Sequence, residues 1–276
     1  IRAARPGPTA AMALACGWLR AGKCSRVVVI SADNPSSANL LPWIGTGFLA
    51  LGAASTQADV ANAALPFDRK RNGMILGAGA VGMVLETDVA LRRCKAGCAG
   101  VCTARCADDH VPRARVLAAL HANSAFHASA IGTLHATRML ESLLVQVETV
   151  HAITRDELAS SLLYVSHETC TYARGGGCAG AEMASLRSAF GASVASILIT
   201  NTKGITGHAM GVCFEDAVAV AALSEGLLPP VVNFKEADPA LGALNLSRGG
   251  HHDAKYALHF AAGFGSQVAY VLYARV

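Results

Sequence analysis

Three short segments of the chain concentrate the polar side chains that suit catalysis or ligand binding. They are residues 166–171 (Ser-His-Glu-Thr-Cys-Thr), residues 201–208 (Asn-Thr-Lys-Gly-Ile-Thr-Gly-His) and residues 263–266 (Gly-Phe-Gly-Ser). Neutral imidazoles donate hydrogen bonds to a thioester carbonyl or a developing enolate, so His167, His208 and the nearby Lys203 suit acyl chemistry. Taken singly, a histidine in such a position is more often a structural residue, and only the combination indicates a site.

Each segment directly follows a predicted strand, the usual place for binding sites in α/β sheets. The apolar pattern predicts strands at 26–31, 116–121, 162–166 and 196–200, and helices at 6–22, 87–95, 132–150, 181–190 and 207–226. It also predicts an antiparallel pair within 73–86 and a terminal hairpin formed by 255–260 and 267–275. Alternating strands and helices predict a layered α/β fold, in which we expect the strand at 26–31 to be buried on both faces.

The composition supports a folded, apolar chain. Of the 276 residues, 53% are hydrophobic and 15% charged, and the mean hydropathy is +0.38, which excludes a disordered segment. The net charge of +4 is too small and too scattered to indicate nucleic-acid binding by itself. A chain with so few charges is expected to bury part of its surface against a partner.

The amino end and the cysteines suggest how the chain is processed and where it resides. The first residue is Ile1, no secretory signal follows it, and this end therefore looks truncated or processed. The apolar stretch 40–54 is broken by Pro42 and three glycines, so we predict buried core and no membrane span. Nine cysteines, an odd number, fit a reducing compartment better than a secreted disulfide scaffold.

Together the motifs resemble the β-ketoacyl-acyl-carrier-protein synthases, in their elongating type. Residues 201–208 are similar to the signature N-T-K-x-x-x-G-H, and residues 167–171 to H-G-T-x-T. Residues 66–68, 71–73 and 77–86 match the family stretch P-F-D-x-x-R-x-G…G-E-G…L-E, and further anchors extend from Leu14 to Tyr273. The resemblance implies a thiolase-like α/β fold with two pseudo-symmetric halves, the amino-terminal one incomplete. Residues 1–110 would be its remnant, with a cysteine-rich insertion at 94–109, and residues 111–276 the carboxy-terminal half.

The resemblance also implies a reaction without a cofactor. A cysteine takes an acyl chain from acyl carrier protein, a malonyl thioester loses its carboxyl group, and the resulting carbanion attacks the acyl-enzyme. By this resemblance, His167 and His208 would hydrogen-bond the malonyl thioester carbonyl, and Lys203 would pair with Glu182 to hold the loop of His167. Supporting roles would fall to Glu182, Gly263, Phe264 and Gly265, with the Phe264 ring gating the acyl pocket.

The chain departs from the family pattern at the nucleophile. An ungapped count from the end of the helix 6–22 places Arg5 at the nucleophile position, and arginine is not a nucleophile. Cys16 lies inside the helix, about three turns further on, and cannot substitute for it. Glu168 replaces the glycine of H-G-T, Ala78 replaces the acid of G-E-G, and the acidic residue expected shortly before Glu182 is missing.

The insertion adds an unusual cysteine pattern. Cys94, Cys98, Cys102 and Cys106 recur every fourth residue, which in a helix gives a stripe too long for one tetrahedral metal ion. We therefore expect an apolar or contact stripe; a zinc site would require a loop. The basic residues around it are Arg92, Arg93, Lys95, Arg105, Arg113 and Arg115. They indicate a solvated face, with docking of an acidic protein or RNA as the alternative.

These observations favour a catalytically inactive synthase homologue that serves as a structural subunit of a larger assembly in a mitochondrion or plastid, or otherwise in the cytoplasm. One alternative is an active 3-oxoacyl-acyl-carrier-protein synthase with an unusual site or with a thiol supplied by a partner chain. Another is a malonyl decarboxylase or an acyl sensor, which needs both histidines but no cysteine. The expected partners are other subunits or a second copy of the chain, with acyl carrier protein as a further candidate.

Overall fold

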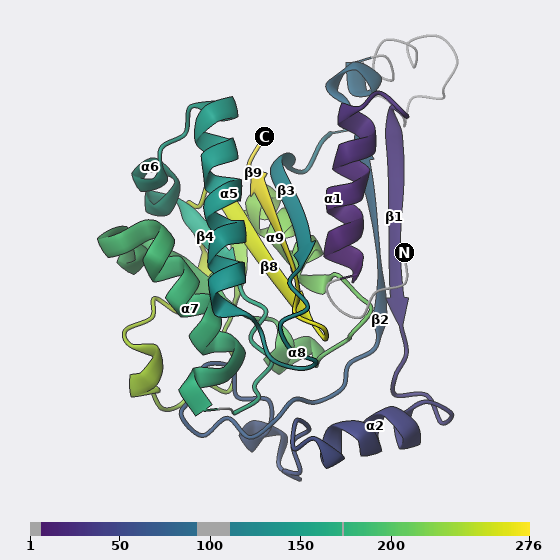
Figure 1. Ribbon diagram of the computed structural model, residues 1–276, viewed down its shortest axis with the longest axis vertical. Coiled ribbons are helices and arrows are strands. Elements are labelled where there is room, and N and C mark those ends of the chain that lie inside the picture. Colours follow the sequence, from purple (N-terminus) through teal and green to yellow (C-terminus); the bar gives the residue numbers. More distant parts are fainter. Residues whose placement is uncertain (1–6, 93–110, 173) are drawn as a thin grey trace.

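The computed structural model describes residues 7–92, 111–172 and 174–276 of the chain (Figure 1). Outside these residues lie the predictions for Arg5 and for the insertion with Cys94, Cys98, Cys102 and Cys106. The division into residues 1–110 and 111–276 stays a prediction.

A five-stranded mixed sheet forms the centre of the fold. Its strands, in spatial order, are β3 (Arg115–Asn123), β9 (Gln267–Ala274), β8 (Tyr256–Gly263), β4 (Leu162–Val165) and β5 (Leu198–Thr200). β4 runs parallel to both of its neighbours, and β9 runs antiparallel to both of its own. The strands predicted at 116–121, 162–166 and 196–200 and the terminal hairpin are thus confirmed. Every position of β8 and β9 between the two end residues is buried, as expected for a sheet covered on both faces.

Helices cover both faces of this sheet (Figure 1). α5 (Thr133–His151) and α7 (Gly177–Phe190) pack on one face, whereas α1 (Gly7–Arg20) and α9 (Phe214–Glu225) pack on the other. On its far side α1 contacts a second, two-stranded antiparallel sheet of β1 (Arg26–Asp33) and β2 (Gly79–Glu86). The order of layers is therefore helices, large sheet, helices and small sheet, which confirms the predicted layered α/β class.

The remaining elements are short. They are α2 (Leu41–Ala50), α6 (Arg155–Ser160), α8 (Lys203–Thr206), β6 (Leu227–Pro230), β7 (Arg248–His251) and the 3-10 helices η1 (Val60–Asn62), η2 (Arg174–Gly176), η3 (Gly191–Ser196) and η4 (Pro239–Leu241). Gly191 ends α7 with a φ of 55°, as the sequence predicts. No helix in the described part of the chain is long and apolar enough to cross a membrane.

The predicted helix 207–226 is wrong over its first third, and the reason lies at a glycine. α8 ends at Thr206, α9 starts only at Phe214, and Gly207 between them has a φ of 66°. Here the chain passes very close to Gly77. A β-carbon on Gly77 would lie only 2.1 Å from the carbonyl oxygen of Thr206. Only glycine permits this approach, and it leaves His208 in a parallel bridge with Leu76 instead of in a helix.

The predicted strand pair within 73–86 is also wrong in its first half. Only β2 is a strand, and its partner is β1, which lies far away in the sequence. Met74 and Leu76 instead form single parallel bridges with Ala54 and His208. Residues 73–86 therefore connect the histidine segment to the small sheet and do not form a hairpin.

Two segments that we expect to be core are exposed. In β1, Val28 and Ile30 point to solvent, so this strand is buried on one face only. Residues 40–54 contain the helix α2, of which only Phe48 is buried, whereas Trp43 and Leu49 are exposed. The sequence marks both segments as apolar, but no other described residues cover these faces.

Candidate functional site

The histidine pair of the candidate site comes from two neighbouring strand ends. β4 ends at Val165 and is followed by Ser166 and His167, whereas β5 leads through α8 to His208. The two imidazole rings meet edge to face, with 6.0 Å between their centroids, and both residues are buried. The ring of Phe260, on β8, lies 6.1 Å from that of His167. The structure therefore brings together the two histidines that sequence reasoning selected.

His208 is held by the crossing segment described above. Its backbone N–H donates a hydrogen bond of 2.6 Å to the carbonyl oxygen of Ile75. Gly207 precedes it and packs against Gly77, with 3.0 Å between an ideal β-carbon at Gly207 and the Cα of Gly77. The position of His208 thus depends on two glycines that the motif alone does not connect.

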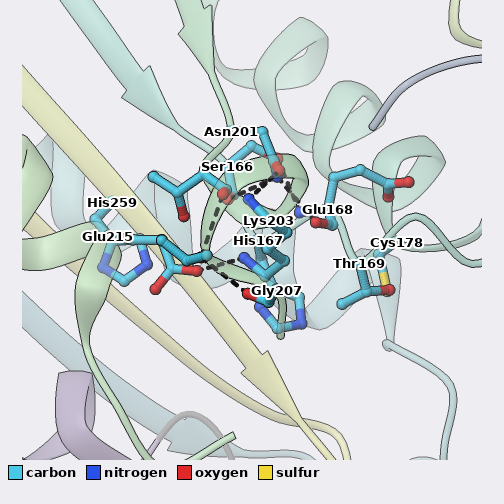
Figure 2. A network of polar contacts seen from close by, with 12 residues as sticks. Ser166, His167, Glu168, Thr169, Cys178, Asn201, Lys203, Gly207, Glu215 and His259 are labelled. Atoms are coloured by element: carbon cyan, nitrogen blue, oxygen red, sulfur yellow. Dashed lines mark hydrogen bonds and ion pairs between the residues drawn. The ribbon is translucent and has the colours of Figure 1, made fainter. Parts of the chain in front are cut away.

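The ammonium of Lys203 forms a buried ion pair with Glu215, in the first turn of α9 (Figure 2). This corrects the expected pairing of Lys203 with Glu182. Lys203 also donates its backbone N–H to Oδ1 of Asn201, at 2.9 Å. Glu215 is a site residue that sequence reasoning missed; its only signal is an acid at the start of a helix in an otherwise apolar region.

Glu182, on α7, binds the loop of His167 directly. Its Oε2 accepts hydrogen bonds from the hydroxyls of Tyr164 (2.9 Å) and Ser166 (2.7 Å) and from the backbone N–H of His167 (3.0 Å). Burial, together with the charge of Glu168, raises the pKa of Glu182 to about 8 against the opposing hydrogen bonds from Ser166 and Tyr164. The expected role of Glu182 is therefore performed without Lys203.

Asn201 ties the ends of β4 and β5 together, and the motif did not identify this role. Its Nδ2 donates to the carbonyl oxygens of Ser166 (3.3 Å) and Glu168 (2.9 Å), on either side of His167 (Figure 2). Backbone carbonyls that flank a buried loop need such donors. The loop of His167 is therefore fixed from two elements, β5 and α7.

Four thiols of the described residues show a shifted pKa, and in each the pKa is raised. Burial raises the pKa of Cys16 and Cys170, and it raises the pKa of Cys178 and Cys213 to about 12. A catalytic thiol needs the opposite, a lowered pKa. These cysteines are consistent with packing rather than nucleophilic catalysis.

Phe264 stands in the bend between β8 and β9, between Gly263 and Gly265. Its ring is half exposed and stacks on Phe48 of α2, with 6.1 Å between the ring centroids. The hydroxyl of Ser266 anchors the bend, because it accepts the backbone N–H of His127 at 3.0 Å. The gating role of Phe264 stays a prediction.

The described residues contain a cavity that lies apart from the histidine pair. A cavity of about 1020 Å³ lies between α1, β2 and α9, and neither His167 nor His208 lines it. No group of three or more histidine, cysteine or acidic residues within the described ranges is arranged to hold a metal ion.

The chain is similar in sequence to bacterial polyketide enzymes, although no family model matches it. It is 27% identical over 231 residues to the tetracenomycin polyketide synthase ketoacyl synthase alpha subunit of Streptomyces glaucescens, covering 80% of this chain and 46% of the relative. It is 28% identical over 220 residues to the oxytetracycline polyketide putative beta-ketoacyl synthase 1 of Streptomyces rimosus, covering 76% and 45%. The chain thus spans about half the length of the curated relatives that it matches.

Solved ketosynthase structures share the fold. A beta-ketoacyl synthase from Burkholderia phymatum matches with a TM-score of 0.79 at 22% identity, over 99% of this chain and 60% of its own. A type II polyketide acyl-carrier protein in complex with its ketosynthase gives 0.77 at 18%, over 98% and 60%. The ishigamide ketosynthase/chain length factor gives 0.76 at 20%, over 98% and 58%. In sequence this chain is therefore similar to ketoacyl synthases, and in architecture it shares the fold of the solved ketosynthases.

Proposed function

We propose that the chain binds a malonyl thioester between His167 and His208 and removes its carboxyl group without condensing it to an acyl chain. The observation that carries this proposal is the meeting of two buried imidazoles at the ends of neighbouring strands. Condensation needs an activated thiol, and among the described residues Cys16, Cys170 and Cys213 have raised pKa values instead, which supports decarboxylation alone.

The proposed step needs two hydrogen-bond donors and no nucleophile. The bond between the carboxylate and the α-carbon breaks, carbon dioxide leaves, and the electron pair becomes the enolate of an acetyl thioester. N–H groups of His167 and His208 would stabilise the enolate oxygen. A proton from water then completes the acetyl thioester. Because a ketosynthase with its acyl-carrier protein is among the fold neighbours, we propose a carrier protein as the donor of the thioester.

We expect the protein to release labelled carbon dioxide from malonyl-acyl-carrier protein while forming no 3-ketoacyl product. His208→Ala should slow this release about 100-fold, because one of two enolate donors is lost. His121→Ala, at an exposed position on β3, serves as the matched control and should leave the rate unchanged. A wild-type protein that releases no carbon dioxide, or forms a 3-ketoacyl product at the same rate, would contradict the proposal.

We also propose that the chain works in an assembly in which another polypeptide covers the outer face of β1 and β2. On this face Val28 (56% exposed), Ile30 (77%) and Val84 (60%) lie beside Gly82 and Ala80 in the cross-strand register. A soluble protein rarely leaves such an apolar patch uncovered. The ishigamide neighbour pairs a ketosynthase with a chain length factor, a precedent for such partnership in this fold.

Light scattering on the purified chain tests the assembly. We expect the chain to associate with itself or with a co-expressed partner, and the double substitution Val28→Lys and Ile30→Lys to abolish this association. Val145→Lys and Val150→Lys, at exposed positions on α5, are the matched control. A stable wild-type monomer would contradict the proposed assembly.

A further inference from the structure

We propose that Glu168, which directly follows His167, is a positioning residue: its buried carboxylate locks the His167 loop to the first turn of α7 and to Arg71. This inference rests on the proposed function of His167 for its catalytic consequence, but its structural part stands independently. In Figure 2 the Glu168 side chain points away from Glu215.

Both oxygens of the Glu168 carboxylate accept a hydrogen bond, and an arginine lies nearby. Oε1 accepts the backbone N–H of Cys170 at 3.1 Å, and Oε2 accepts the backbone N–H of Ala179, in the first turn of α7, at 2.9 Å. The guanidinium Nε of Arg71 lies 3.7 Å from Oε1, and both side chains are inaccessible to solvent. One carboxylate thus joins the His167 loop, a helix N-terminus and a distant loop.

Arg71 makes this junction rigid, because its other contacts are also buried. Its NH1 donates to Asp238 at 2.7 Å and to the carbonyl oxygen of Asp68 at 2.8 Å, while its NH2 donates to the carbonyl oxygen of Gly176 at 3.2 Å. An arginine held by three buried hydrogen bonds keeps its position and so fixes the carboxylate of Glu168 beside it.

Hydrogen bonds with two other residues restrain the main chain around His167. Glu182 binds the N–H of His167, and Asn201 binds the carbonyl oxygens of Ser166 and Glu168. The side chain of Glu168 supplies the third restraint, through the backbone N–H groups of Cys170 and Ala179. A shift of Glu168 would therefore be transmitted to the ring of His167 through a single peptide unit.

Two departures from the expected sequence pattern meet at this point. Glu168 stands where the motif has glycine, and no acidic residue stands in the first turn of α7, shortly before Glu182, where the pattern has one. In the fold, the carboxylate of Glu168 binds the N–H of Ala179 in that same turn. The His167 loop thus supplies the negative charge to the first turn of α7, which has no acidic residue of its own. Because burying a carboxylate is costly, such a charge persists only where its partners are fixed.

The groups that face Glu168 decide its charge. Burial raises the pKa of Glu168 to about 7, while Arg71, the N–H groups of Ala179 and Cys170, and Lys203 lower it. Glu182, Cys170 and Cys178 also face it, and the negative charge of Glu168 raises the pKa of each. The restraint on His167 should therefore be strongest above pH 7, where Glu168 is ionised.

Nuclear magnetic resonance of histidine-labelled protein tests the inference without requiring activity. We expect the His167 ring signal, assigned with His167→Gln, to show an inflection near pH 7 that Glu168→Gln removes. In decarboxylation assays above pH 7, Glu168→Gln should lower kcat about tenfold and leave KM unchanged, because binding groups remain in place. Glu236→Gln removes an exposed carboxylate paired with Arg69 and Lys70 and should change neither readout.

The outcomes separate the two proposals. If the wild-type protein is inactive but the His167 signal responds to Glu168→Gln, the proposed function fails and the positioning role holds. If the signal and the pH profile of Glu168→Gln match those of the wild type, the positioning role is overturned. If Glu168→Gln does not fold, Asp238→Asn, which unlinks Arg71 from η4, must move the His167 signal, and its failure to do so also overturns the role.

Discussion

Replacement of Asp216 by alanine should lower the free energy of unfolding by about 3–5 kcal/mol, because a buried carboxylate that accepts three hydrogen bonds is removed. Its Oδ1 accepts from His259 Nδ1 and from the Tyr273 hydroxyl, each at 2.8 Å. Its Oδ2 accepts from the hydroxyl of Thr9 at 2.9 Å. Asp216 thereby joins α9 to β8, β9 and the first turn of α1, so its loss loosens the layer between the two sheets.

The measurement is thermal and urea unfolding of the wild-type protein and of Asp216→Ala. For a chain of this size, the expected loss corresponds to a fall in Tm on the order of 10 °C. Asp156→Ala removes an exposed carboxylate bound by Ser193 and should change Tm by no more than a degree or two. Equal unfolding curves for Asp216→Ala and Asp156→Ala would contradict the role of Asp216 as the hub of these four elements.

The second large effect concerns Glu182 and pH. The folded protein raises the pKa of this carboxyl from 4.5 to about 8, chiefly by burial, so the folded state retains a proton that the unfolded chain releases. The contribution of this group to stability is therefore complete below pH 4.5 and is lost as the pH rises towards 8. Glu168 acts in the same direction up to about pH 7.

Glu182→Gln should remove this dependence, because the amide resembles the protonated acid and still accepts from Tyr164, Ser166 and His167. We expect equal stability of the two proteins near pH 5 and a growing advantage for Glu182→Gln between pH 6 and 8, in urea titrations. Subtracting the two curves cancels the contributions of groups that are not coupled to Glu182, such as His252, whose pKa is lowered by burial.

The matched control is Glu225→Gln, at an exposed carboxylate paired with Arg113. Its free energy of unfolding should change with pH in parallel with that of the wild type between pH 5 and 8, since exposed ion pairs contribute little to stability. Parallel curves for Glu182→Gln would show that Glu182 is already ionised in the folded protein at neutral pH. The buried position of Glu182 would then have to be compensated by stronger hydrogen bonding than its contacts indicate.

The sequence alone predicts most elements of this fold, because helices and strands follow from local apolar periodicity and from residues such as Gly191 that end them. It also selects His167, His208 and Lys203, since motif spacing survives at low identity. It fails at residues 207–213, where the backbone follows a close approach between Gly207 and Gly77. Such an approach depends on residues far apart in the chain, and no local pattern records it.

Partner choice likewise belongs to the tertiary structure. The sequence offers several acids to Lys203, and only the packing of α8 against the start of α9 selects Glu215 over Glu182. The same holds for Asp216, whose partner Thr9 lies 207 positions away in the sequence. Exposure is decided in the same way: the apolar side chains of β1 and α2 look like core until the fold shows which of their faces is covered. Residue types and spacing thus indicate the family resemblance and the chemistry that is available. Contacts between distant segments decide which charges meet and which surfaces stay exposed, because the energies of these contacts depend on burial and geometry rather than on sequence order.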